Sequence, residues 1–143
     1  MTTAQTTLLM AIYDLEVTRT FRYRPSLLLQ YFCNESINSS TLIGCLDAIA
    51  HKISASFLKE LSMQVVTHSL PSGVAEEVCR ILIACTHRYR KVREIAMGYA
   101  RQIIETFSAL MCDRHVVFTL LEILTLMRRS CELQYTDEVR FAR

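Results

Sequence analysis

An acid, a cation and an imidazole stand side by side at residues 113–115, Asp-Arg-His, within the stretch LMCDRHVVFTLL. In a phosphotransfer catalytic loop, an aspartate accepts the proton of the attacking hydroxyl and a nearby asparagine helps to hold a metal ion. Here residues 116–118 are valine, valine and phenylalanine, which offer no such ligand. Asp113 is better interpreted as the N-cap of an apolar helix, because its carboxylate can accept amide hydrogens of the first turn. The stretch is therefore not a catalytic loop.

The histidines and cysteines form no recognised catalytic or zinc-binding pattern. Cys85 and His87 lie two residues apart, so on a helix they point away from each other, and a Cys–His nucleophile would have to assemble in space. No H-E-x-x-H or C-x-x-C spacing occurs, so we expect no metal site. We expect the thiols to be small buried side chains in a reducing compartment. The histidines are His51, His68, His87 and His115, and the cysteines are Cys33, Cys45, Cys79, Cys85, Cys112 and Cys131.

Nucleotide binding is not supported either. Phosphates need a glycine-rich loop or closely approaching backbone amides. Gly44, Gly73 and Gly98 are isolated from one another, and no G-x-x-x-x-G-K-[ST] motif is present. We therefore expect no cofactor in this chain.

The composition indicates helices. Hydrophobic residues make up 51% of the sequence, with only three glycines and two prolines, too few for the turns of an all-β fold. Residues 5–22 predict a helix with the apolar stripe Leu8, Ile12 and Leu15. Residues 34–41 predict a loop, and residues 41–70 a long helix with a possible break at 54–56.

The second half of the chain shows the clearest helical periodicity. Ser72 is expected to cap a helix with Glu76 and Glu77 near its positive end. Its apolar residues are Val74, Val78, Ile81, Leu82 and Cys85. Residues 90–107 form the cleanest amphipathic pattern, with one side formed by Val92, Ile95, Ala96, Tyr99, Ile103 and Phe107. A third helix, from Asp113 to about Glu132, is apolar nearly all round, so it must be covered on more than one side. No span of about 18 apolar residues occurs, so we expect no transmembrane helix.

Paired helices, one amphipathic and one nearly all apolar, are typical of stacked helical repeats. We expect an all-α fold, a right-handed α-solenoid of armadillo- or HEAT-like hairpins with about five to seven helices. A compact helical bundle remains the alternative, because no strict internal repeat is visible. We expect a single segment, 1–143, with N-terminal helices in 1–33, the long or broken helix in 41–70, helical repeats in 72–132 and a frayed tail in 133–143.

The most basic stretch is HRYRKVR, residues 87–93, which we call the basic stretch. Its cations are Arg88, Arg90, Lys91 and Arg93, whereas the whole chain has a net charge of only +2. The total is too small to indicate a nucleic-acid partner. The cluster lies at the start of a predicted helix, where cations are mildly unfavourable, so an anionic partner such as a lipid head group is one interpretation. The other is a solvated turn partly neutralised by Glu94.

Several motifs resemble a known family. These are K-x-R-x-I-A at 91–96, F-x-x-L-M-C-D at 107–113 and V-F-x-L-L-E-x-L-T-L-x-R-R-x-C-E at 117–132. YDLE at 13–16 and VVTHSL at 65–70 are consistent with the same region. Together they resemble the fungal type III alpha phosphatidylinositol 4-kinases, in the helical solenoid upstream of the kinase domain.

The resemblance implies a scaffold role. Enzymes of this family use ATP and a divalent metal to phosphorylate phosphatidylinositol, but their catalytic residues have no counterpart in this chain. The resemblance implies contacts with the rest of the kinase solenoid and with plasma-membrane scaffold proteins, and a cytoplasmic location peripheral to the plasma membrane. The family's Tyr-Thr-Asp-Glu segment continues differently from residues 139–143 here, so we expect a truncated product or a piece of a longer protein.

Two alternatives remain open. The chain could be an autonomous adaptor that binds a partner helix or an anionic surface through the basic stretch. It could also be a small enzyme that uses Cys85 or a histidine, for which the pattern offers little support.

Overall fold

The described part of the chain is entirely helical. The computed structural model describes residues 2–22, 26–38, 41–66 and 73–140. Within these residues there is no strand, which confirms the predicted all-α class. The elements are α1 (Thr3–Phe21), α2 (Leu28–Tyr31), α3 (Glu35–Asn38), α4 (Leu42–Val66), α5 (Val74–Ala84), α6 (Arg90–Thr106), the 3₁₀ turn η1 (Ser108–Cys112) and α7 (Arg114–Arg140).

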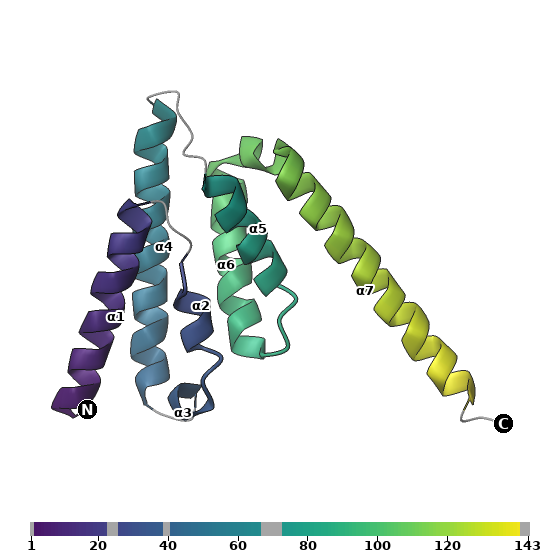
Figure 1. Ribbon diagram of the computed structural model, residues 1–143, viewed down its shortest axis with the longest axis horizontal. Coiled ribbons are helices and arrows are strands. Elements are labelled where there is room, and N and C mark those ends of the chain that lie inside the picture. Colours follow the sequence, from purple (N-terminus) through teal and green to yellow (C-terminus); the bar gives the residue numbers. More distant parts are fainter. Residues whose placement is uncertain (1, 23–25, 39–40, 67–72, 141–143) are drawn as a thin grey trace.

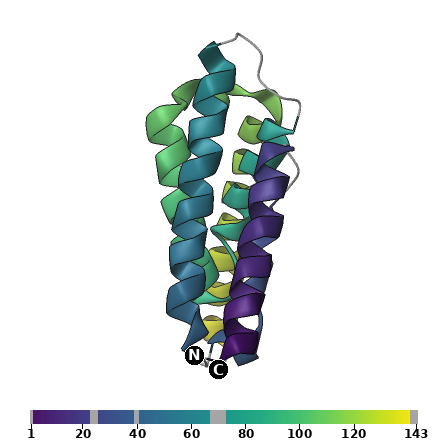
Figure 2. The same cartoon turned by 90° about the vertical axis from the view of Figure 1, so that its left-hand side faces the viewer.

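The long helices stack in alternating directions. Figure 1 shows α4 and α6 running one way, and α5 and α7 running the opposite way. Figure 2 looks along the stack and shows α4 and α6 on one side, with α5 and α7 on the other. Helix α4 packs on α6, and α5 packs on both α6 and α7. Helices α4 and α5 thus each lie beside the next-but-one helix of the chain, and α1 packs on α4. This packing is consistent with a helical solenoid.

Polar contacts establish that α4 and α6 are parallel neighbours. Lys91 Nζ lies 2.9 Å from Asp47 Oδ2, and the Ser54 hydroxyl donates a hydrogen bond of 2.8 Å to Gln102 Oε1. Between these two contacts, the buried hydroxyl of Tyr99 donates to the carbonyl oxygen of Ala50. The partners advance together along both helices, which fixes the register of one helix on the other.

The core follows the predicted faces of α5 and α6. On α5, Val74, Val78, Ile81 and Leu82 are buried as predicted, whereas Cys85, at the C-cap, is only partly buried. On α6 the buried residues are Val92, Ile95, Ala96, Tyr99 and Ile103, and the predicted Phe107 is partly buried. The expected cap Ser72 lies outside the described residues, and the N-cap position of α5 is Gly73. Among the described residues, no helix is sufficiently long and apolar to cross a membrane.

The predicted stripe on α1 was correct for Ile12 and wrong for Leu8 and Leu15, which are exposed. The buried face consists of Leu9, Ile12, Glu16 and Thr20. Glu16 lies on this inner face, where the Ser26 hydroxyl and the Leu27 amide donate hydrogen bonds to its carboxylate.

Two predicted irregular segments contain regular helix. In the predicted loop 34–41, Asn34 Oδ1 accepts a 3.0 Å hydrogen bond from the Ser36 amide, and this contact supports the short helix α3. The possible break at 54–56 is absent, because α4 is continuous from Leu42 to Val66. The Ser54 hydroxyl bonds to Gln102, so it does not compete for the backbone of its own helix.

Helix α7 leaves the stack soon after it begins. Val116 is fully buried, and Leu120 and Ile123 are partly buried. Beyond Ile123, every side chain described up to Leu133 is exposed. Figure 1 shows the later turns of α7 diverging from the other helices. The helix continues to Arg140, past the end expected near Glu132, so residues 133–140, where a frayed tail was expected, have helical backbone. Residues 141–143 lie outside the described part.

Val116 and Val117 provide a matched test of how α7 is anchored. Val116 is 0% exposed and Val117 is 38% exposed, and both are on the same helix. Replacing Val116 by alanine should reduce the free energy of unfolding by about 2 kcal/mol, because a buried side chain is truncated. Val117→Ala should change it by less than about 0.5 kcal/mol. Urea unfolding followed by circular dichroism measures both, and equal losses would show that the start of α7 is not packed as described.

Candidate functional site

The exposed part of the basic stretch is formed by Arg88 and Arg90. The Arg88 guanidinium lies 4.7 Å from the centre of the Tyr89 ring and donates a 3.0 Å hydrogen bond to the Tyr89 hydroxyl. Arg90 Nε lies 2.7 Å from Glu94 Oε1, and the Arg90 side chain is 85% exposed. Such an exposed pair contributes little to stability, so Arg90 can exchange this partner for another anion at small cost.

The other two cations of the basic stretch serve the fold. Arg93 donates hydrogen bonds of 2.7 Å to the carbonyl oxygen of His87 and 2.9 Å to that of Arg88. It therefore closes the turn between α5 and α6. Lys91 is paired with Asp47 across the α4–α6 interface. The structure thus divides the predicted cluster into an outer pair, Arg88 and Arg90, and an inner pair, Lys91 and Arg93.

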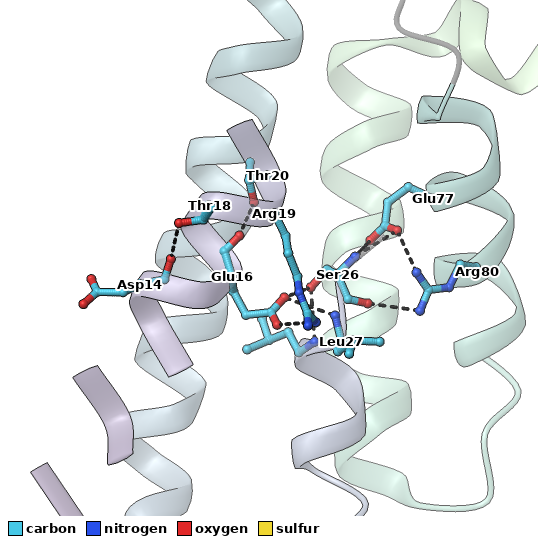
Figure 3. Close-up of polar contacts among 10 residues, drawn as sticks. Asp14, Glu16, Thr18, Arg19, Thr20, Ser26, Leu27, Glu77 and Arg80 are labelled. Atoms are coloured by element: carbon cyan, nitrogen blue, oxygen red, sulfur yellow. Dashed lines mark hydrogen bonds and ion pairs between the residues drawn. The ribbon is translucent and has the colours of Figure 1, made fainter. Parts of the chain in front are cut away.

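A buried carboxylate organises the opposite part of the stack. Glu16 is 0% exposed, and its carboxylate accepts a 2.8 Å hydrogen bond from the Ser26 hydroxyl and one of 3.1 Å from the Leu27 amide. Arg19, one turn later on α1, lies 3.1 Å from the other carboxylate oxygen. Figure 3 shows these side chains meeting between α1 and the segment before α2. The carboxylate is thus both neutralised and hydrogen-bonded, as a buried charge requires.

A second carboxylate holds the same segment from the other side. The Ser26 amide donates to both carboxylate oxygens of Glu77 on α5, at 3.3 and 3.2 Å. Arg80 lies 3.3 Å from Glu77 and donates a 3.1 Å hydrogen bond to the Ser26 carbonyl oxygen. Figure 3 shows Ser26 between the two glutamates. We call Glu16, Arg19, Ser26, Glu77 and Arg80 the glutamate clasp. It connects α1 to α5 through the backbone of residue 26.

Burial governs the protonation of the clasp. Loss of solvent raises the pKa of the Glu77 carboxyl above its ordinary value, and Arg80 and the Ser26 amide only partly oppose this effect. The negative charge of Glu16 raises it further. Two carboxylates in one site could suggest acid–base chemistry. Here, however, the carboxylate oxygens are occupied by backbone and side-chain donors of the fold, so the clasp is a structural lock between helices.

Glu16 was not predicted to be buried, and Glu77 was predicted only to be a favourable negative charge at a helix start. Glu76 and Glu77 do lie in the first turn of α5, as expected. The one available signal for the clasp was the position of Glu16, four residues after Ile12 and seven after Leu9, which places it on a helix face with apolar neighbours.

Asp113 is the helix cap that the sequence predicted. Its Oδ1 accepts hydrogen bonds of 2.8 Å from the His115 amide and 3.4 Å from the Val116 amide. Its carboxylate therefore accepts hydrogen bonds from backbone amides in the first turn of α7, which have no partner within the helix.

The cysteines were predicted incorrectly as buried. Cys45, Cys112 and Cys131 are exposed, and Cys33, Cys79 and Cys85 are partly buried. Burial raises the pKa of the Cys85 thiol, which keeps it protonated and disfavours a role as nucleophile. Among the described residues, no group of three or more histidine, cysteine or carboxylate side chains is arranged to hold a metal ion.

Among the described residues, several large apolar side chains of α7 are exposed, and Leu124 is 61% exposed. We call the side of α7 that carries Val117, Phe118, Leu121, Leu124 and Met127 the α7 apolar face. Leu126 and Leu133 are also exposed, on the opposite side of the helix. Apolar surface of this kind marks a contact with another protein element.

The raised pKa of Glu77 predicts a definite pH dependence. A carboxyl whose folded pKa exceeds its unfolded value stabilises the fold most below the unfolded pKa, and this contribution is lost as pH rises through the folded pKa. Urea unfolding measures the stability of the wild type and of Glu77→Gln. The wild type should lose stability relative to Glu77→Gln as the pH rises above about 4, the ordinary pKa of a glutamate carboxyl. A difference that moves in favour of the wild type would mean that pairing with Arg80 outweighs burial.

One curated protein is similar to nearly the whole chain. Phosphatidylinositol 4-kinase stt4 of Schizosaccharomyces pombe is 27% identical over 138 residues, which cover 96% of this chain and 7% of that protein. No protein-family model matches the sequence, and no solved structure matches it. The chain thus has a distant similarity to a small part of a fungal phosphatidylinositol 4-kinase.

Proposed function

We propose that this chain is a non-catalytic scaffold segment of a phosphatidylinositol 4-kinase, in which it supports the fold and the docking of partners. The observation that carries the proposal is the extent of the similarity, which runs along 96% of this chain within 7% of a much longer kinase. A segment of that size inside a long protein acts by packing against its neighbours.

The helix stacking supports a position inside a longer solenoid. Repeats of a solenoid bury their apolar faces on neighbouring repeats, and terminal repeats need a polar outer face. Within the described part of the chain, the side chains of the α7 apolar face are instead exposed. We propose that the next helical repeat of the kinase covers it, with the right-handed superhelix expected of armadillo- or HEAT-like repeats.

The chemistry of the kinase would lie elsewhere in the parent protein. In this proposal, the kinase domain binds ATP and a divalent metal, and phosphorylates phosphatidylinositol. This segment contributes no catalytic residue. Its partners are the rest of the kinase solenoid and plasma-membrane scaffold proteins, and it reaches the cytoplasmic side of the plasma membrane only through the parent complex.

Self-association of the isolated chain tests this proposal. An uncovered α7 apolar face should drive dimerisation, which sedimentation velocity measures. Replacing Leu121 and Leu124 by glutamine should weaken it at least about tenfold, because two apolar side chains leave the interface. The matched control replaces Met63 and Met97 by glutamine. These side chains are 63% and 51% exposed on α4 and α6, and their replacement should leave dimerisation unchanged.

A wild-type chain that stays monomeric at the highest concentration tested, and unfolds in one cooperative transition, would contradict the proposal. It would favour an autonomous adaptor, because a domain that folds alone does not expose an apolar terminal repeat that self-associates.

A second candidate function is binding of an anionic membrane surface by the basic stretch. The exposure of Arg90 and the position of Arg88 over Tyr89 favour it. Lys91 and Arg93 were part of the predicted site, and their contacts with Asp47 and the α5–α6 turn make them supports for the outer pair.

Liposome sedimentation tests this candidate. Arg88→Gln with Arg90→Gln should reduce binding to vesicles that contain phosphatidylserine by about tenfold or more, since each cation near such a surface contributes about 1 kcal/mol. Arg128→Gln with Arg129→Gln removes the same charge from α7 and is the matched control. Equal binding by the wild type and the first variant would rule out a membrane role for the basic stretch.

A further inference from the structure

A cysteine and a histidine that are far apart in the sequence meet at a cavity between α2 and the α5–α6 turn. Cys33 Sγ lies 3.7 Å from His87 Nε2. Both line a cavity of about 250 Å³, together with the apolar Leu29, Ile81 and Ala84 and with Glu77 and Arg80 of the glutamate clasp. The sequence analysis had paired His87 only with Cys85. The fold instead brings His87 to a thiol 54 residues away in the sequence.

The hydrogen bond that His87 accepts at Nδ1 determines whether its other ring nitrogen donates to Cys33 or accepts from it. Its Nδ1 accepts a 3.2 Å hydrogen bond from the Tyr89 amide, so the proton of the neutral imidazole is on Nε2. The Nε2–H therefore points at Cys33 Sγ. In this arrangement His87 cannot remove the thiol proton through Nε2, and it cannot ligate a metal ion there. It can donate a hydrogen bond to a thiolate.

The thiol has a second partner. The Cys33 S–H lies within hydrogen-bond distance of the Leu29 carbonyl oxygen, with Sγ 3.6 Å from it. The protonated sulfur thus donates to Leu29, and the deprotonated sulfur accepts from His87. Both forms are accommodated without a change of fold, and Cys33 is a partly buried residue that lines the cavity. A partly exposed thiolate beside a hydrogen-bond donor is the arrangement found at reactive cysteines.

We propose that Cys33 is a ligand-directed modification site for a small apolar α,β-unsaturated carbonyl compound. The cavity is slightly smaller than typical ligand pockets and mostly apolar, so it suits a compact hydrocarbon body. The deprotonated Cys33 sulfur forms a bond to the β-carbon, and the electron pair of the carbon–carbon double bond moves toward the carbonyl to give an enolate. Solvent then returns one proton to the α-carbon, so the thiol has added across the double bond. No oxidant or leaving group is involved.

The exposed cysteines of the same chain provide internal controls. The full chain is incubated with increasing concentrations of cyclohexenone, and alkylation at each cysteine is measured by peptide mass spectrometry. The modification rate at Cys33 should saturate with concentration and exceed the rates at Cys45 and Cys112 by about tenfold, because the cavity binds the compound beside the sulfur. A rate at Cys33 that rises linearly and does not exceed those of the exposed cysteines would overturn the proposal.

Two variants separate the cavity from the histidine. Ala84→Leu fills the cavity and should abolish saturation at Cys33, while the rates at Cys45 and Cys112 stay unchanged. His87→Leu removes the Nε2–H donor and should lower the maximal rate at Cys33 by about tenfold, the size expected for one hydrogen bond to a charged group. If circular dichroism shows that both variants keep their helices and neither changes the reaction at Cys33, the proposed site is wrong.

Discussion

The carboxylate of Glu16 is shielded from water, and its need for hydrogen-bond donors determines how the first part of the chain runs. A buried charge is stable only when it is paired and hydrogen-bonded, and Arg19, Ser26 and Leu27 meet that need. Because the Ser26 hydroxyl and the Leu27 amide both donate to Glu16, residues 26 and 27 lie against α1. The amide and carbonyl oxygen of Ser26 then face α5, where Glu77 and Arg80 bind them.

The glutamate clasp therefore links helices that the hydrophobic core alone would not place in a fixed register. Apolar packing is non-directional, whereas a carboxylate that receives backbone amides permits one position of the chain. The α4–α6 interface uses the same device, with Lys91, Tyr99 and Gln102 each opposite one group of α4. Together these contacts define a frame from which α5 and α6 extend, and α7 is attached to that frame only by its first turns.

Much of the second half of the chain was predictable from the sequence. The buried faces of α5 and α6 follow a clear apolar period, and the cap at Asp113 follows from a carboxylate before an apolar run. Such features depend on neighbours in the sequence. The glutamate clasp and the Cys33–His87 contact join residues from different helices, and their partners cannot be deduced from spacing.

The same distinction explains the wrong predictions. The stripe of Leu8, Ile12 and Leu15 was the best apolar period in α1, but of these three only Ile12 is buried, beside Leu9, Glu16 and Thr20. The donors that satisfy the buried Glu16 are Ser26 and Leu27, which the spacing within α1 does not show. The apolar composition of α7 correctly indicated a helix that needs cover on several sides. Composition does not say which element supplies that cover. Within the described residues, α7 packs on α5 and η1, and its buried or partly buried apolar side chains are those of Val116, Leu120 and Ile123 in its first turns.

The central claim is that these helices are one part of a longer kinase solenoid. Sequencing the full-length transcript tests it most directly. The account predicts a reading frame that continues beyond the codon for Arg143 through further helical repeats and ends in a kinase domain. A stop codon directly after Arg143 in every transcript would contradict it, because the chain would then function alone.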